Sequence, residues 1–358
     1  MDLSPFLEDL ENRMNPAIEE QLLARWQDFA EGRWTGPIFS PRRAIAALPK
    51  VAWPHVLVND ALHDPDQMVL HQLGACSAAL TEGNGELLTV RANYGTCILP
   101  SLFGAEIFQM EREMDTLPTS KPFSGGAAAM QTLIEQGIPD PVNGLGSAVM
   151  AMTHRFQEIL QPYPRLSRYI HLYHPDTQGP MDVCELLWGS GLFLDVIDQP
   201  DLVHALLHLI SETYIRFLNA WYAIVGGRDV GGRGVGGRGV HFHWAMLHRG
   251  TIMLRDDSAM NFSPRLFEQF IEPYDQRLLD EFGGGAIHSC GRVDHYIHRL
   301  GQMRGVYALN LSQPEYNDME QVFRHTLDRG ILLLALDRKT AESALARRRD
   351  LRGRVHCW

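Results

Sequence analysis

The chain has 358 residues, of which 45% are hydrophobic and 21% are charged, so it is long enough to bury a large core. Its formal net charge is −11, and it has no long basic run, which excludes a general nucleic-acid binder with a concentrated positive face. No apolar run approaches the ~20 residues of a membrane span, and the first residues lack the apolar segment of a signal peptide. The five cysteines are scattered, unlike a secreted disulfide framework. We therefore expect a cytoplasmic globular protein.

Residues 1–59 are expected to form an N-terminal helical extension. Ser4-Pro5 is typical of a helix start, and apolar residues recur at helical spacing between Leu7 and Phe29. A proline-rich connection follows, and Asp64-Pro65 opens the next predicted helix. We place the boundary of the second domain at residue 60.

In residues 60–358, short apolar runs alternate with helical segments. The expected strands are Glu86–Asn93, Ala105–Met110, Arg168–Tyr173, Gly250–Arg255, Ala286–Cys290, Val306–Leu311, Ile331–Leu336 and Arg354–Cys357. The run at 105–110 is equally compatible with a helix. Alternation of strands and helices predicts parallel β/α units, and eight such units predict an α/β fold of the (β/α)8 TIM-barrel type.

A five-residue unit rich in glycine and arginine is repeated between Val225 and Val240. One interpretation is a flexible loop that arose by slippage. The other is a lid in which Arg228, Arg233 and Arg238 grip an anion, since arginine binds carboxylates well.

The stretch "GGGAIHSCG" places an imidazole and a thiol two residues apart at a strand end. In an extended backbone, residues i and i+2 point to one side, so His288 and Cys290 can converge on a single ion. Zinc prefers such nitrogen and sulfur ligands, and its catalytic sites use three protein ligands. Cys357, at the end of the last predicted strand, is the candidate third ligand. The alternative is a buried histidine and cysteine that make ordinary core contacts.

Other predicted strand ends carry polar residues that could bind or act on a substrate. Asp257 follows an apolar run and precedes a helix start, which suits a general base, although such a residue can also satisfy nearby backbone N–H groups. The remaining candidates at strand ends are Arg91, Asn93, Tyr94, Asp176 and Gln178. His243, with His241 and His248, lies beside the repeat. We expect these three histidines to be mostly exposed, with metal ligation or substrate binding as the alternative.

Five stretches together resemble the uroporphyrinogen decarboxylase superfamily. They read "RANYGTCILPSLFGAE", "TQGPMDVCELLWGSG", "DQPDLVHALLHLISE", "DDSAMNFSPRLFEQFIEPY" and "GGGAIHSCGRVDHYI". The resemblance runs from about Asp60 to the end and implies a (β/α)8 barrel with its site at the mouth. True decarboxylases carry Arg-Gln-Ala-Gly-Arg-Tyr after the first strand, whereas this chain has "VRANYGT", with Arg91 and Tyr94 only.

The methyltransferase branch of this superfamily matches better. It holds zinc with His-x-Cys at one strand end and a cysteine at the last strand, which correspond to His288, Cys290 and Cys357. The departure is that the sequence ends at Trp358 without a final barrel helix, whose place the N-terminal helices would have to cover.

The resemblance implies a zinc-dependent methyltransferase-like enzyme that moves a methyl group from a donor, such as a methylated corrinoid, to a thiol. Asp257 and Gln178 would orient the substrate. One alternative is a metal-free carboxy-lyase that uses Asp257 and Tyr94. Another is a non-catalytic barrel that binds a corrinoid or another small molecule. The expected partners are a small-molecule substrate, a separate corrinoid protein and a second copy in a homodimer, with no nucleic acid and no membrane.

Overall fold

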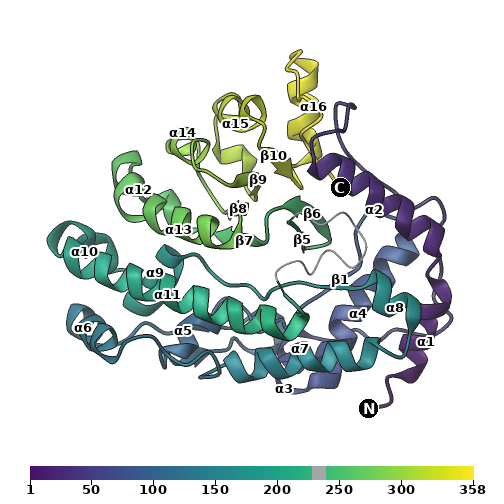
Figure 1. Ribbon diagram of the computed structural model, residues 1–358, viewed down its shortest axis with the longest axis horizontal. Coiled ribbons are helices and arrows are strands. Elements are labelled where there is room, and N and C mark those ends of the chain that lie inside the picture. Colours follow the sequence, from purple (N-terminus) through teal and green to yellow (C-terminus); the bar gives the residue numbers. More distant parts are fainter. Residues whose placement is uncertain (228–238) are drawn as a thin grey trace.

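Helices surround a central set of strands in a computed structural model, which describes residues 1–227 and 239–358 (Figure 1). The fold is mixed α/β. Arg228, Arg233 and Arg238, the predicted anion-gripping residues, lie outside the described residues.

The first half of the chain is mainly helical. Its helices are α1 (Ser4–Arg13), α2 (Pro16–Ala30), α3 (Val58–His63), α4 (Pro65–Glu82), α5 (Ile98–Leu102), α6 (Gly126–Gln136), α7 (Gly146–Leu160), α8 (Pro164–Tyr169), α9 (Pro180–Trp188), α10 (Leu192–Asp198) and α11 (Pro200–Val225). Short strands lie between them: β1 (Thr89–Val90), β2 (Ile107–Phe108), β3 (Thr119–Ser120) and β4 (His171–Leu172). Several helices begin with proline, whose missing N–H costs nothing in the first turn.

The second half carries the longer strands. These are β5 (Val240–His243), β6 (Met246–Arg249), β7 (Ile252–Arg255), β8 (Gly285–Ser289), β9 (Val306–Leu311) and β10 (Leu332–Leu334). The helices are α12 (Pro264–Phe270), α13 (Glu272–Phe282), α14 (Ile297–Leu300), α15 (Met319–His325) and α16 (Arg338–Ala346). Four short 3₁₀ turns complete the described elements: η1 (Arg112–Met114), η2 (Ser258–Asn261), η3 (Pro314–Tyr316) and η4 (Leu327–Arg329).

Strands β7, β8, β9 and β10 form a parallel sheet in that spatial order. Beyond β10, single parallel bridges join Leu333 to Val355 and Phe39 to His356. On the other side, the Gly179 N–H donates to the Arg255 carbonyl at 2.8 Å, and β4 pairs in parallel with β1. Within the part of the chain that the structure describes, no continuous ladder closes these segments into a cylinder.

Side chains alternate between the two faces of this sheet. Ile252, Leu254, Ile287, Leu309 and Leu333 belong to an outer cluster, packed towards the helices. Met253, Ala286, Ala308, Leu332 and Leu334 belong to an inner cluster. This alternation follows from the two-residue period of a strand. The next inward positions are Arg255, His288 and Asn310, which are paired across β7, β8 and β9.

The inner face is covered by the antiparallel hairpin of β5 and β6, which the sequence analysis did not predict. Phe242, Met246 and Leu247 of this hairpin belong to the inner cluster. The turn of this hairpin is hydrogen-bonded to the segment before β1, because the Leu87 N–H donates to the Ala245 carbonyl at 2.8 Å. Figure 1 shows the hairpin in the centre of the strands.

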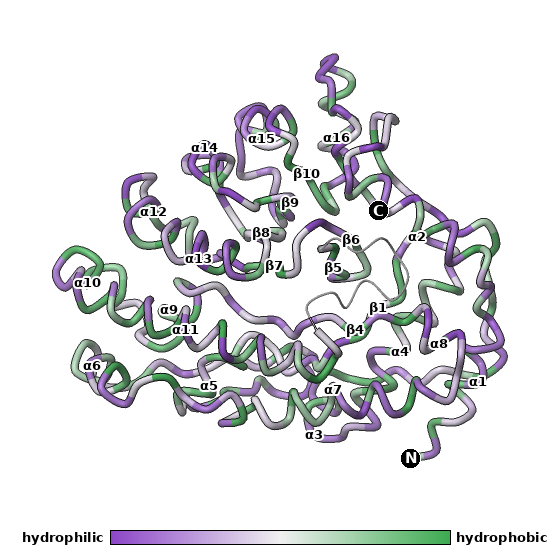
Figure 2. Tube along the Cα trace, viewed as in Figure 1, coloured by the Kyte–Doolittle hydropathy of each residue, from purple (hydrophilic) through white to green (hydrophobic). Residues whose placement is uncertain are grey.

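Helix α2 packs beside the C-terminal segment. Trp26 is fully buried, its ring lies 4.7 Å from that of His356, and its indole N–H donates to the Gly85 carbonyl at 2.8 Å. An N-terminal helix therefore covers the last strand-like segment. Figure 2 shows β10 as mostly hydrophobic, whereas α15 and α16 alternate between hydrophobic and hydrophilic residues.

Seven of the eight predicted strand positions contain a strand, four of them in the parallel sheet. The prediction for Ala105–Met110 as a barrel strand is wrong, because β2 pairs in antiparallel with β3 and both of its residues are exposed. Arg354–Cys357 contributes only the single bridges. Part of Arg168–Tyr173 belongs to helix α8 instead.

No described helix has the length and apolar character to cross a membrane.

Candidate metal centre

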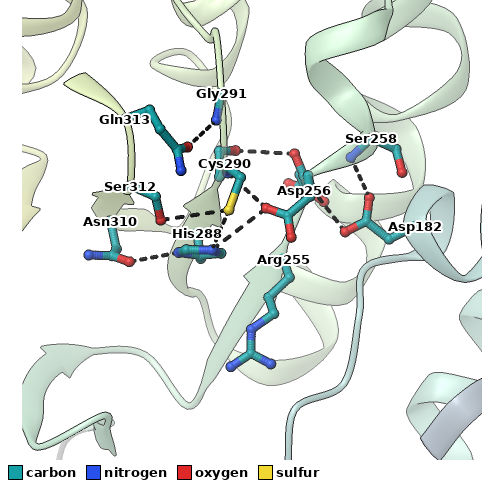
Figure 3. Close-up of polar contacts among 12 residues, drawn as sticks. Asp182, Arg255, Asp256, Ser258, His288, Cys290, Gly291, Asn310, Ser312 and Gln313 are labelled. Carbon is teal, nitrogen blue, oxygen red and sulfur yellow. Dashed lines mark hydrogen bonds and ion pairs between the residues drawn. The ribbon is translucent and has the colours of Figure 1, made fainter. Parts of the chain in front are cut away.

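Three neighbouring strands deliver polar side chains to one end of the sheet. Asp257 follows β7, His288 lies in β8 with Cys290 directly after it, and Ser312 follows β9. Figure 3 shows His288 and Cys290 with their partners Asn310 and Ser312. In parallel sheets the carboxyl ends of the strands form the usual place for a ligand.

The ligand atoms of Asp257, His288 and Cys290 all lie within 4.8 Å of one another. The Cys290 Sγ is 3.4 Å from the His288 Nε2, and the Asp257 Oδ1 is 3.6 Å from the same nitrogen. Donor atoms around a tetrahedral zinc ion lie about 3.3–3.6 Å apart, given bonds of ~2.0–2.3 Å. These spacings therefore suit a zinc ion, and the nitrogen, sulfur and oxygen donors are ones that zinc accepts.

The orientation of His288 is determined by Asn310. The Asn310 Nδ2 donates to the Leu334 carbonyl at 2.8 Å, so its Oδ1 must face the imidazole. That oxygen lies 2.6 Å from His288 Nδ1, which therefore carries the proton. The lone pair of Nε2 is left to face Cys290 and Asp257, the arrangement that a metal ligand needs.

Asp257 is held by backbone hydrogen bonds. The N–H groups of Asp257 and Ser258 donate to the carboxylate of Asp182, at 3.0 and 2.7 Å (Figure 3). The Cys290 N–H in turn donates to the Asp257 Oδ1 at 2.7 Å. The loop after β7 and the end of β8 are thereby held together.

Burial sets the protonation states of this group. It raises the pKa of the Cys290 thiol to about 11, with help from the neighbouring Asp257 charge. It also lowers the pKa of His288. Without a metal, the group at neutral pH is a thiol beside a neutral imidazole, and binding a cation would release the thiol proton.

Cys357, the predicted third ligand, does not join this group. No group of metal-ligand atoms among the residues with described positions includes it. Val355 pairs with Leu333, an outer-cluster residue, and Cys357 shares its side of the segment, so its thiol is buried in the outer cluster. The sequence correctly indicated a cysteine at the end of the last strand-like segment, but the two-residue period of an extended chain turns Cys357 away from the inner face. Asp257 takes the third position instead.

Arg91 and Asp176 do meet, in a buried ion pair. The Asp176 carboxylate contacts the guanidinium groups of both Arg91 and Arg255. Burial alone would raise the pKa of Asp176, but Arg255 and Arg91 together lower it. Arg255 also lies over the Trp244 ring, with 4.3 Å to its centroid. The network lies at the level of His288 in the sheet, since Arg255 and His288 are paired.

His243 and His248 are completely buried, and His241 is nearly so, which contradicts the expected exposure. Strand β5 turns His241 and His243 towards His174, and the ligand atoms of these three residues also lie within 4.8 Å of one another. Burial lowers the pKa of His174 to about 3 and keeps it neutral.

This second group of histidines suits a metal poorly. His174 uses both ring nitrogens, at 2.8 Å from the Pro175 carbonyl and at 3.1 Å from the Met253 N–H. The Arg255 guanidinium lies 3.2 Å from the His243 Nε2, so a bound cation would meet a positive charge. We therefore treat the group around Cys290 as the candidate metal centre.

Gln178 lines a pocket of about 490 Å³ that also borders Asp257. Asn93 and Tyr94 are buried in the segment after β1. No hydrogen bond or ion pair among the described residues links either of them to the Asp257, His288 and Cys290 group. Burial raises the pKa of Tyr94, so its phenol stays protonated.

Three further residues of the site were not predicted from the sequence: Asn310, Ser312 and Asp182. The sequence did contain a signal for Asn310. In the stretch "YALNLS", a carboxamide interrupts an apolar strand on the same side as Ala308. Asp182 gave no such indication, because its role depends on the contact between α9 and the loop after β7.

The fold is similar to that of a methyltransferase from Methanosarcina mazei. The two chains have 17% sequence identity and a TM-score of 0.56, with coverage of 78% of this chain and 71% of that chain. At this identity, the similarity concerns the fold. No protein-family model matches the sequence, and no curated protein matches it.

Proposed function

We propose that the chain is a zinc-dependent, methyltransferase-like enzyme of the uroporphyrinogen decarboxylase superfamily with a (β/α)8-type barrel. It would move a methyl group from a donor, such as a methylated corrinoid on a partner protein, to a thiol acceptor. The observation that carries this proposal is the convergence of His288, Cys290 and Asp257 at the end of the parallel sheet. The fold similarity to a methyltransferase supports it.

In this proposal, His288, Cys290 and Asp257 hold the ion. Zinc in such a site lowers the pKa of a bound thiol and so supplies a thiolate at neutral pH. Asn310 orients the imidazole, and Asp182 holds the loop that carries Asp257. Gln178, at the border of the neighbouring pocket, contacts the substrate.

The carboxy-lyase alternative has less support. It requires Asp257 and Tyr94 to act together, and no hydrogen bond within residues 1–227 and 239–358 joins them. The geometry around Cys290 therefore favours the methyl-transfer proposal.

A methyl-transfer assay tests the proposal. Zinc-loaded protein is mixed with methylcobalamin and a panel of small thiols, and loss of the methyl–cobalt absorption is followed. We expect thiol-dependent demethylation that falls at least about 100-fold in Cys290→Ala, because removal of a metal ligand removes the activated thiolate. Equal demethylation rates for Cys290→Ala and the wild-type protein would refute the proposed function.

A further inference from the structure

A pocket of about 490 Å³ opens beside the candidate metal centre. Its polar lining includes Gln178, Asp182, Glu185, Asp257, Ser258 and Asn261. Asp257 is thus shared between the pocket and the metal centre, so a substrate bound here would reach Cys290 and His288. Figure 3 shows Asp182 and Ser258 on the opposite side of Asp256 from His288 and Cys290.

The lining is rich in hydrogen-bond acceptors and has no positive charge. Three of its residues are carboxylic acids, and none of the described lining residues is lysine, arginine or histidine. Glu185 accepts a hydrogen bond from the Ser258 hydroxyl at 2.5 Å, which holds its carboxylate in place. An anionic substrate would therefore meet like charge on entering.

Gln178 provides an independent indication of a ligand. Its side chain is buried, with 7% of the residue exposed, and its Oε1 has no hydrogen-bond partner among the described residues. A buried carbonyl oxygen without a donor is unfavourable, so a donor on a bound molecule would satisfy it.

We infer that this pocket binds the protonated amine of an aminothiol substrate. The inference rests on the proposed function, which supplies the thiol. Asp257 and Glu185 provide negative charge, and Gln178 provides a further acceptor. None of the lining residues is aromatic, so the pocket lacks the ring faces that favour quaternary ammonium ions. A primary ammonium, with three N–H donors, fits the acceptors better.

The two buried arginines near the pocket suggest the opposite result, a preference for an anionic substrate. Arg91 and Arg255 share one carboxylate, that of Asp176, and a substrate anion directed towards them would reverse the expected charge preference. The experiment must therefore compare thiols that differ in charge.

Three thiols of similar size serve as probes: cysteamine, mercaptoethanol and mercaptopropionate. Their dissociation constants are measured by ligand-observed NMR on the metal-free protein of residues 1–358 at near-neutral pH. We expect cysteamine to bind roughly fivefold more tightly than mercaptoethanol, and mercaptopropionate to bind most weakly, because one charge pair near a surface is worth about that factor.

Glu185→Gln should abolish most of the preference for cysteamine. Its carboxamide oxygen can still accept the Ser258 hydroxyl, so the local structure is retained. Glu342→Gln, on α16 and away from the pocket, is the matched control and should leave the preference unchanged.

Equal binding of the three thiols, tighter binding of mercaptopropionate, or no saturable binding of cysteamine would each overturn the inference. A preference that survives in Glu185→Gln would also overturn it. A zinc titration of the same preparation separates this result from the proposed function. Protein that binds zinc without the charge preference retains the metal centre and loses only the aminothiol pocket.

Discussion

Asn310 determines which nitrogen of His288 faces the cysteine. Its amide is oriented by the Leu334 carbonyl, and its oxygen accepts the Nδ1 proton of the imidazole. A single buried carboxamide thereby selects the tautomer whose free lone pair points towards Cys290. Residues that orient a metal-binding histidine in this way commonly affect metal affinity as strongly as the ligands do.

Replacing Asn310 by alanine should weaken zinc binding about 10- to 100-fold, because the imidazole can then rotate or change tautomer. The dissociation constant is measured by competition with a chromogenic chelator. Ser312→Ala is the control, since Ser312 lies 3.6 Å from the thiol but does not orient the histidine. An affinity in Asn310→Ala that matches the control would show that Asn310 has no positioning role.

Two buried carboxyl groups lie behind the metal centre. Asp256 and Asp275 are almost completely buried, and within the described ranges their side-chain oxygens have no hydrogen-bond partner other than each other. Burial and the charge of Asp275 raise the pKa of Asp256 well above its usual value, and burial also raises the pKa of Asp275. The native state therefore binds protons that the unfolded chain releases.

This has a consequence for the pH dependence of stability. For an acid with a raised native pKa, the stabilisation is complete below the unfolded value of about 4 and is lost as the pH rises towards the native pKa. Asp275→Asn should therefore increase the free energy of unfolding by about 1–3 kcal/mol near neutral pH and leave it unchanged near pH ~4.

Urea unfolding at several pH values measures this difference. Asp198→Asn, at an exposed position at the end of α10, is the control and should show no such trend. If Asp275→Asn is less stable than the wild-type chain at neutral pH, the buried carboxyl pair does not lower the stability of the native state there.

At the scale of elements, helix α2 and the C-terminal segment depend on each other. Trp26 lies 5.0 Å from Phe39 and 4.7 Å from His356, measured between ring centroids, and Phe39 forms a parallel bridge with His356. The helix begins at Pro16, after Asn15 accepts a hydrogen bond from the Ala17 N–H at 3.0 Å. Trp26 thus packs helix α2 against the C-terminal segment.

Trp26→Ala should lower the free energy of unfolding by about 3–5 kcal/mol, since it leaves a large cavity in the inner cluster. Trp26→Phe should cost less, because it keeps most of the buried ring and loses only the hydrogen bond to Gly85. Thermal and urea unfolding of the two variants measure the difference. Similar stability of Trp26→Ala and the unchanged chain would mean that α2 is only loosely attached.

The strands that were predicted correctly are those whose apolar pattern can be recognised within a short stretch of sequence. Val306–Leu311 is a strand at the predicted positions, and β7, β8 and β10 lie within the predicted ranges or one residue away. Their apolar runs are bounded by glycine or by helix starts. The prediction of a barrel strand for the AEIFQM run was wrong, because an apolar run alone does not distinguish a barrel strand from an exposed hairpin.

The composition of the site was predictable only in part. His288 and Cys290 were found because one strand carries both, and the two-residue spacing puts them on one face. Asp257 was identified as a functional residue, but its place beside Cys290 depends on the pairing of β7 with β8. Cys357 was misplaced because the bridge of Val355 to Leu333, which sets the side it faces, is a tertiary contact.

At the scale of the whole molecule, residues 1–59 contribute to the packing of the rest. Arg43 donates to the Asn84 carbonyl at 2.9 Å, and Phe39 lies in the inner cluster. Arg13 donates to the Ser77 hydroxyl at 2.6 Å and so links α1 to α4. These contacts join the predicted extension to the predicted barrel domain.

A chain that starts at residue 60 should therefore lose cooperative unfolding, because it exposes the inner cluster around His356. Near-ultraviolet circular dichroism and a thermal melt measure this loss, with the chain of residues 1–358 as reference. A sharp transition in the shortened chain would instead establish residues 60–358 as an independent domain, as the sequence analysis supposes.

The metal centre is the central claim, and zinc content measures it most directly. The protein of residues 1–358 is purified without a metal-binding tag, dialysed against zinc and analysed for zinc per chain, alongside Cys290→Ala and Cys357→Ala. We expect about one zinc ion per chain, which is lost in Cys290→Ala and retained in Cys357→Ala, because Asp257 and not Cys357 lies beside His288. Absence of zinc from the unchanged chain, or its loss in Cys357→Ala, would contradict the site described above.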